Sequence, residues 1–170
     1  MRNLKSKLQY EFFLRPSEVV APDLLNTTLI IGDNRCEIIE VEAYGGSNDP
    51  ASHAFNGPTP RSQIMFDTVG TIYIYQIYGM HFCFNVVAHQ ENQPGAVFIR
   101  AVQCRQNGYI NGPGKFCKAW SIDKSMNGIS LVQSNSHYFI QNHTINEYIT
   151  TSRIGIKKGK DLLWRFKRKD

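Results

Sequence analysis

Two β-rich runs that lie only three residues apart constrain the fold of this chain more than any other feature of its sequence. The runs are residues 71–77 and 81–88, and Tyr78-Gly79-Met80 lies between them. Strands this close in the chain pair as an antiparallel hairpin. Hairpin tips normally carry polar turn residues, so Tyr78 and Met80 indicate a tip that meets something apolar: a base stack, the protein's own core or a partner protein.

The remaining predicted elements are short and mostly β. Further strands are expected at residues 29–31, 37–44, 96–102, 128–140 and 149–156, and helices at 15–25, made irregular by Pro22, and from 111 to about 120. Residues 45–61 read as a long, functional loop. Since no βαβ rhythm is visible, we predict an α+β fold. It is a single compact domain over residues 1–170, with a mostly antiparallel curved sheet, peripheral helices and a protruding β-hairpin. Residues 1–14 and 167–170 are expected to be peripheral or flexible.

Apolar content and cysteine spacing narrow the class of protein. Of the 170 residues 42% are hydrophobic, which suffices for one core, but no apolar run approaches the roughly 20 residues that span a bilayer. Residues 1–10 are basic and polar, so we expect a cytoplasmic protein of bacterial type, or a nuclear one in a eukaryote, and not a secreted one. The four cysteines are widely separated. Their spacing predicts buried, reduced thiols, and neither a metal nor another cofactor is expected.

Positive charge is concentrated near the end of the chain. Residues 153–170 carry a net charge of +6, whereas residues 1–152 carry −1. Trp164 and Phe166 are interleaved with these cations. This composition suits a surface that faces phosphates, and it equally suits a solvated, frayed tail.

Two predicted strands supply charged side chains that could act together. The alternation of residues 37–44 places Glu40, Glu42 and Tyr44 on one face. Arg100 interrupts the apolar run 96–102 and needs an acceptor if it is buried. Arg100 and Glu42 could hold one water between them and orient it as a nucleophile, or Arg100 could form a structural salt bridge with Glu40 or Glu42.

Aromatic side chains behind the hairpin tip could form a pocket for a flipped base. Tyr73 and Tyr75 would line it together with Tyr44 and His53, and Asn85 has the same face parity. A purine alkylated at N3 or N7 is cationic, and a cation gains about 0.5–2 kcal/mol on an aromatic face. Cross-strand packing of the tyrosines, and a hydrogen bond from Asn85 to a strand neighbour, are the structural alternatives.

In this order, these residues resemble the alkyladenine (3-methyladenine) DNA glycosylase family. The matching strings, over residues 15–166, are VEAYGG (41–46), DPASHA with His53, TPR (59–61), TIYIYQIYGMHFCFNV (71–86), VFIRAV (97–102), NGPGKFCKA (111–119), RIGI and WRF. The resemblance implies a monofunctional hydrolase that acts as a monomer on double-stranded DNA containing damaged purines. Expected substrates are 3-methyladenine, 7-methylguanine, hypoxanthine and ethenoadenine. After Thr59-Pro60-Arg61 this chain has Ser62-Gln63-Ile64 in place of the Asn-x-Gly pattern of the family. This departure bears on peripheral DNA contacts and substrate range and not on the aligned pocket.

The resemblance also implies roles for individual residues. Glu42 is the general base and Arg100 helps to hold the water. The base-binding residues are Tyr44 and His53 on one side, Tyr75 on the other, and Asn85, which excludes the 2-amino group of guanine. Tyr78 is the intercalating wedge, and Met80 packs beside it in the minor groove.

Two other functions remain open from the sequence. A non-catalytic nucleic-acid-binding module would use the basic tail and the aromatic hairpin without Glu42 or Arg100. A bifunctional lyase would need an amine in the pocket to form a Schiff base. No lysine lies between Lys7 and Lys115, so we expect no lyase activity.

Overall fold

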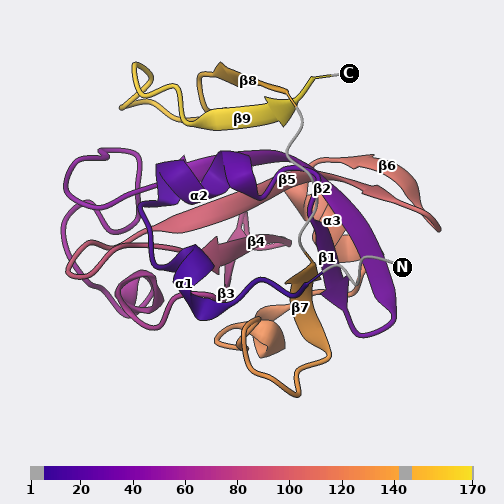
Figure 1. Cartoon of the computed structure of the whole chain (residues 1–170). Helices are drawn as coiled ribbons and strands as arrows, with labels where there is room; N and C mark the ends of the chain where they lie inside the picture. Colours follow the sequence, from indigo (N-terminus) through magenta and orange to yellow (C-terminus); the bar gives the residue numbers. More distant parts are fainter. Residues whose placement is uncertain (1–5, 142–146, 170) are drawn as a thin grey trace.

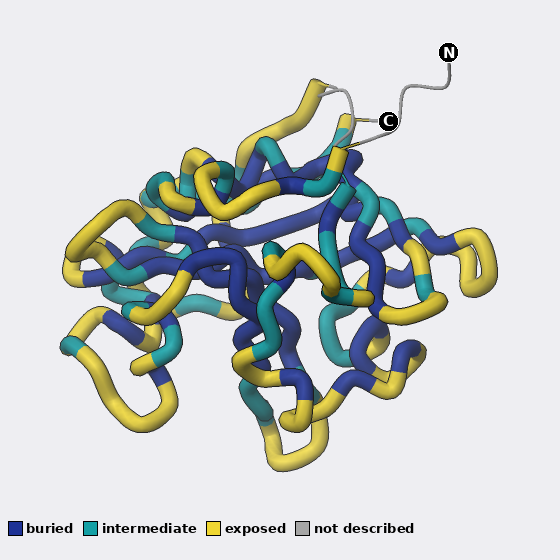
Figure 2. Tube along the Cα trace, turned by 60° about the horizontal axis from the view of Figure 1, so that its bottom comes forward, coloured by how far each residue is buried: buried dark blue, intermediate teal, exposed yellow. Residues whose placement is uncertain are grey.

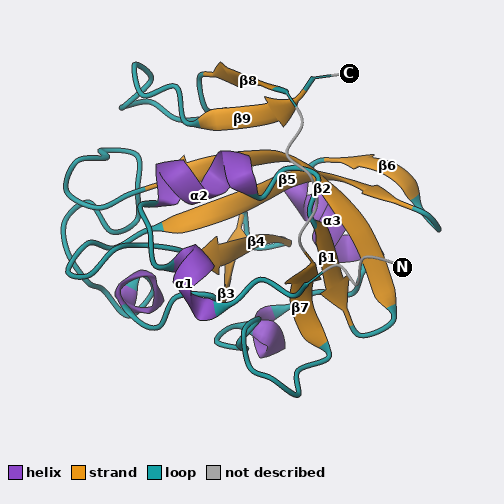
Figure 3. Ribbon diagram, viewed as in Figure 1, coloured by secondary structure: helices purple, strands orange, loops and turns teal. Residues whose placement is uncertain are grey.

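The computed structural model describes residues 6–141 and 147–169, and it is dominated by strands (Figure 1, Figure 3). The strands are β1 (Thr28–Ile31), β2 (Asn34–Tyr44), β3 (Ile72–Ile77), β4 (His81–Val87), β5 (Ala96–Cys104), β6 (Gly108–Asn111), β7 (Tyr138–Gln141), β8 (Tyr148–Thr151) and β9 (Arg165–Arg168). The α-helices are α1 (Tyr10–Phe13), α2 (Ser17–Asp23) and α3 (Pro113–Ala119), and the 3₁₀ turns are η1 (Gln63–Phe66) and η2 (Lys124–Met126).

The strands form one curled sheet in which every pairing among the described residues is antiparallel. Its main order is β3-β4-β5-β2-β1-β7, with β6 added to β5 and with β9 paired to both β2 and β8. The predicted α+β fold with a mostly antiparallel curved sheet is therefore confirmed. The hairpin is confirmed as well, because β3 pairs with β4 from Ile72↔Val86 to Ile77↔His81.

Several predicted elements are shorter than expected. Of residues 128–140 only the end from Tyr138 is strand, and of residues 149–156 only the part up to Thr151. Pro22 lies inside α2 but in its last turn, so the helix ends one residue later. The helix in the string NGPGKFCKA begins at Pro113, at the first helical position, where the missing N–H of proline costs no hydrogen bond.

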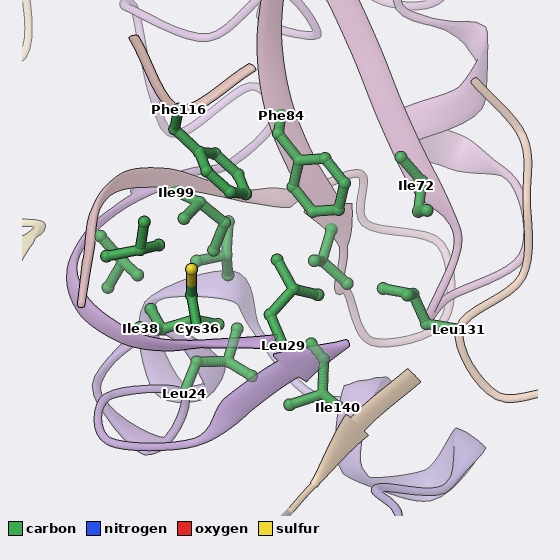
Figure 4. Close-up of a cluster of buried hydrophobic side chains, with 14 of the residues drawn as sticks. Leu24, Leu29, Cys36, Ile38, Ile72, Phe84, Ile99, Phe116, Leu131 and Ile140 are labelled. Carbon is green, nitrogen blue, oxygen red and sulfur yellow. The ribbon is translucent and has the colours of Figure 1, made fainter. Parts of the chain in front are cut away.

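The main core lies between the inner face of the sheet and the segments that cover it. Its fully buried side chains include Leu24 directly after α2, Leu29 of β1, Phe84 of β4, Ile99 of β5 and Phe116 of α3 (Figure 4). The central strands are mostly buried, whereas many of the exposed residues lie in loops (Figure 2). A second, smaller cluster joins Tyr73 and Val87 of the β3–β4 hairpin to Met65 of η1.

The first and last described segments of the chain are built into this fold. Leu8 and Phe13 are buried in the main core, and Phe166 of β9 packs into it from the other end. Lys167 and Arg168, expected at the periphery, lie in β9. In the register of the two strands, Lys167 is opposite Glu40 of β2. In the part of the chain that the structure describes, no helix is long and apolar enough to cross a membrane.

Among the described residues, most of the bonds from the edge strand β3 to segments other than β4 lie near its start. Ile72 exchanges backbone hydrogen bonds with Gly128 and Ile129, and the N–H of Ile74 donates to Asn127 Oδ1 at 2.8 Å. Further along, Arg61 Nη2 donates to the carbonyl of Gln76 at 3.2 Å. The hairpin is thus secured by backbone bonds at its root.

The expectation of four reduced thiols is wrong for two cysteines. Cys36 and Cys104 are directly opposite each other on β2 and β5, and they form a disulfide. The two residues are 68 positions apart, so only the strand register brings them together. Cys83 and Cys117 are free and buried, as expected.

This difference can be tested by thiol counting. Protein that is denatured without reductant should be alkylated at Cys83 and Cys117 only, and at all four cysteines after reduction. Peptide mass spectrometry identifies the modified positions. Alkylation of Cys36 and Cys104 without reductant would contradict the cross-strand bond.

Candidate active site

A pocket of about 370 Å³ opens at the end of the sheet where β2 finishes and β5 begins. Seven of the residues singled out from the sequence line it, namely Tyr44, His53, Tyr73, Tyr75, Tyr78, Asn85 and Arg100. They come from β2, the following loop, the β3–β4 hairpin and β5. A volume of this size lies within the range of small-molecule sites. Residues far apart in the sequence therefore meet at one cavity.

Glu42 lies directly behind this lining and has no solvent-exposed surface. Its Oε1 accepts a hydrogen bond from the backbone N–H of Ile154 at 2.7 Å, and its Oε2 accepts one from the Tyr44 hydroxyl at 2.8 Å. Burial raises the pKa of Glu42, and the nearby Arg100 and the two hydrogen bonds oppose that rise. The carboxyl group therefore holds its proton to a higher pH than an ordinary glutamate does.

Arg100 lies between two carboxylates. Its Nη1 is 3.5 Å from Glu42 Oε2, and its Nε is 3.4 Å from Glu40 Oε1. The pairing of β2 with β5 is irregular at this point, since Glu40 is opposite Ala101 and Val41 is opposite Ile99. Such irregularities often reorient a side chain beside an active site. Of the arrangements left open by the sequence, the structure contains ion-pair contacts of Arg100 with both glutamates.

The aromatic side chains form the walls of the pocket. The His53 ring packs edge-on against Tyr75 at a centroid distance of 4.7 Å, and its Nδ1 is 3.0 Å from the Tyr73 hydroxyl. Removal of the ring from water lowers the pKa of His53 to about 4, and the nearby Arg61 contributes to this. Near neutral pH the imidazole is therefore uncharged.

Asn85 is fixed by its strand neighbours while it lines the pocket. Its Nδ2 donates to the carbonyl of Tyr73 at 3.1 Å and to that of Cys83 at 3.4 Å. The expected alternative of a hydrogen bond to a strand neighbour is thus found. The amide forms a rigid part of the wall.

Two groups of lining residues were not indicated by the sequence. Phe98 lines the pocket, and its ring centre lies 6.2 Å from that of Tyr75. Strand parity could have indicated this position, because Phe98 is two residues before Arg100 on the same strand. Residues 154–156 also line it. They were expected to continue a strand, and no local pattern indicates that they border a cavity.

A fully buried ion pair joins this segment to the loop that carries His53. Arg153 binds both oxygens of Asp49 at 2.7 Å, and neither side chain has solvent-exposed surface. Asp49 also accepts backbone N–H bonds from Gly45 and Ala51, while the guanidinium lies 4.7 Å from the centre of the Tyr44 ring. The pair therefore fixes both the loop and the segment beside Glu42.

The structure changes the interpretation of the basic tail. Arg153 is buried, Arg165 Nε donates to Glu40 Oε1 at 2.7 Å, and Arg168 lies 3.4 Å from Glu37. These cations cannot all belong to a phosphate-facing surface. Exposed lysines remain at 157, 158 and 160, directly after the pocket-lining residues 154–156.

The hairpin tip projects into solvent and does not fold back on the core. Tyr78 is 88% exposed and Met80 68%. Tyr78 and Gly79 both have positive φ, of 51° and 65°, within a turn closed by the bond from Met80 N–H to the Ile77 carbonyl. A tyrosine in this region costs roughly 1 kcal/mol, which is unusual for a side chain with few contacts of its own.

Comparison with known proteins gives one consistent result. A model of the family described as Methylpurine-DNA glycosylase (MPG) matches residues 11–170. A relative from Sodalis glossinidius, named "Putative 3-methyladenine DNA glycosylase", is 45% identical over 162 residues, which cover 94% of this chain and 95% of that protein. Relatives with the same name from Rickettsia peacockii and Ehrlichia chaffeensis are each 43% identical, over 94% of this chain and 88% and 91% of their own lengths.

The buried ion pair predicts a large effect on stability. Asp49→Asn leaves the Arg153 charge buried without its partner, so the free energy of unfolding should fall by about 3–5 kcal/mol. Urea denaturation followed by fluorescence measures the change. The control is Asp23→Asn, since the Arg15–Asp23 pair is about one-third exposed and its loss should cost about 1 kcal/mol or less. Equal losses in the two variants would contradict the role of the buried pair.

Proposed function

This chain belongs to the methylpurine-DNA glycosylase family, and on that premise we propose that it flips damaged purines out of duplex DNA and hydrolyses their N-glycosidic bonds. The product is an abasic site, with which base excision repair begins. One observation carries the proposal: a buried carboxylate, Glu42, lies directly behind an aromatic pocket at the base of an exposed hairpin. The residues that line this pocket can then be given roles in the reaction.

The aromatic walls would hold the flipped base. Tyr44 and His53 would contact one side of it and Tyr75 the other, with Asn85 at its edge. A cationic alkylated purine gains about 0.5–2 kcal/mol on such faces, and the neutral His53 adds no repulsion. Because the Asn85 amide is held by two backbone carbonyls, it would exclude the 2-amino group of guanine by its fixed position.

Glu42 would act as the general base. The water oxygen attacks C1′ of the sugar, the bond from C1′ to the purine nitrogen breaks with its electron pair leaving on the base, and Glu42 accepts the proton of the water. Each oxygen of Glu42 accepts one protein hydrogen bond, so lone pairs remain for a water. Arg100 would help to hold that water from its position 3.5 Å from Oε2.

The hairpin tip would replace the extruded nucleotide in the duplex. Tyr78 would insert as the wedge and Met80 would pack beside it in the minor groove. Their high exposure supports this assignment, since the fold itself gives these side chains little to contact. Among the residues that the structure describes, no lysine lines the pocket, which supports hydrolysis without a lyase step.

Glu42→Gln keeps the shape of the side chain but removes the base. In a single-turnover assay on duplexes carrying 3-methyladenine, 7-methylguanine, hypoxanthine or ethenoadenine, this variant should lose at least about 100-fold in rate while still binding the DNA.

The pH dependence of the wild type tests the raised pKa of Glu42. Because protonation inactivates the base, the rate should fall as the pH decreases, and the fall should begin at a higher pH than for an ordinary glutamate.

The control for Glu42→Gln is Glu37→Gln, on the same strand but outside the pocket, which should be as active as the wild type. Wild-type release by Glu42→Gln would refute the role of Glu42. Lesion binding by the wild type without release on any duplex would favour the non-catalytic binding module.

Salt dependence tests the approach of the lysines to DNA phosphates. Lys157→Gln combined with Lys158→Gln should reduce the slope of log K against log salt by about one for each phosphate that the variant no longer neutralises. The matched control combines Arg35→Gln with Arg105→Gln, which are exposed at the ends of β2 and β5 that lie away from the pocket. Equal slopes for the lysine variant and the wild type would exclude these lysines from the DNA interface.

A further inference from the structure

Glu40 is a charged side chain beside the pocket to which the proposed reaction gives no role. It lies on β2, two residues before Glu42, and its side chain is 4% exposed. Its Oε1 accepts a hydrogen bond from Arg165 Nε at 2.7 Å and lies 3.4 Å from Arg100 Nε. One carboxylate oxygen is therefore shared by two guanidinium groups, and one of these, Arg100, lines the pocket.

Four charges of alternating sign form a chain that runs from β9 to the pocket: Arg165, Glu40, Arg100 and Glu42. Successive contacts are 2.7, 3.4 and 3.5 Å long. The first is a normal N–H···O hydrogen bond, and the other two exceed the usual range. Among the described residues, Arg100 Nε has no hydrogen-bond partner although it is buried. Arg100 is attracted by two carboxylates and held closely by neither.

We propose that Glu40 is a positioning residue, whose carboxylate holds Arg100 back from Glu42 so that Glu42 stays free to accept a proton from water. Arg165 weakens the attraction of Glu40 for Arg100, because it donates a hydrogen bond to the same oxygen of Glu40. The inference rests on the function proposed above. Without Glu40, Arg100 would be free to close on Glu42 as the bidentate pair that guanidinium and carboxylate groups prefer. Without Arg165, Glu40 would be free to draw Arg100 away.

Because of the charges around Glu42, loss of Glu40 and loss of Arg165 should shift the pKa of Glu42 in opposite directions. The charged and titratable groups that face it or belong to the chain of charges come from β2, β5, β9 and the segment after β8: Glu40, Tyr44, Arg100, Arg165 and Arg153. In this group Glu40 is the negative neighbour of Glu42. Its loss, together with a closer Arg100, lowers the pKa of Glu42. Loss of Arg165 removes a cation and weakens the contact with Arg100, which raises that pKa.

The test is single-turnover base release as a function of pH by the full chain, on the lesion duplex that the wild type cleaves best. The acid limb of the pH–rate profile is the part in which the rate falls as Glu42 is protonated. Glu40→Gln should move this limb down by about one pH unit, which is the size of pKa shift that one nearby charge produces. It should also lower the plateau rate on the order of 10- to 100-fold, since small misplacements near reacting atoms are costly. Its affinity for the duplex should stay within about twofold of the wild type, because the change leaves the aromatic walls intact. Arg165→Gln should move the acid limb up.

Glu37→Gln is the matched control. Glu37 lies on the same strand and pairs with Arg168 of β9 at 3.4 Å, but it does not line the pocket. Its acid limb and plateau should match those of the wild type. A purely structural role for Glu40 would lower stability and leave the acid limb unmoved.

The outcomes separate this inference from the proposed function. An active wild type whose acid limb is unmoved in both variants, or moved in the same direction, overturns the role of Glu40 alone. If Glu40→Gln fails to fold, the shift of Arg165→Gln decides, since that side chain is 22% exposed and easier to replace. A wild type that releases no base from any lesion overturns the proposed function and this inference together.

Discussion

Charged groups can remain in the interior of a protein only if they are paired, and the ion pair between Arg153 and Asp49 shows how this requirement shapes the molecule. Asp49 belongs to the loop after β2, and Arg153 precedes the segment that lines the pocket. Their bidentate contact brings Ile154 to Glu42 and places a cation over the Tyr44 ring. The pocket is therefore closed on one side by an electrostatic contact, and its geometry depends on that contact as much as on the sheet.

Much of the fold could be predicted because it follows from local patterns. The spacing of the two β-rich runs specified the hairpin, and strand parity placed Glu40, Glu42 and Tyr44 on one face. The position of residues 154–156 could not be predicted, because it follows from contacts such as that of Ile154 with Glu42, 112 positions earlier in the chain. The pairing of Cys36 with Cys104 likewise depends on register.

The charged residues could be counted in the sequence, but the groups with which they pair could not be identified from it. Eight cations in residues 153–170 suggested a surface that faces phosphates. In the structure Arg153 and Arg165 neutralise buried carboxylates, so part of that charge serves the interior. Arg100 was recognised as a buried cation that needs an acceptor. Its position between two glutamates depends on an irregularity in the β2–β5 register, which carries no sequence signature.

The attachment of β3 has a mechanical consequence. Its root is clamped by backbone bonds at Ile72 and by the Asn127 side chain at Ile74, and Arg61 tethers it once more at Gln76. Past Gln76 the described residues give the hairpin no further hydrogen bond to a neighbouring segment, so we expect the exposed tip at Tyr78 to bend more easily than the part that borders the pocket. We expect bending of the tip to be taken up beyond Gln76, so that Tyr73 and Tyr75, which lie between the bonded positions, move little. The same two strands can in this way carry a compliant tip and a firmly held cavity wall.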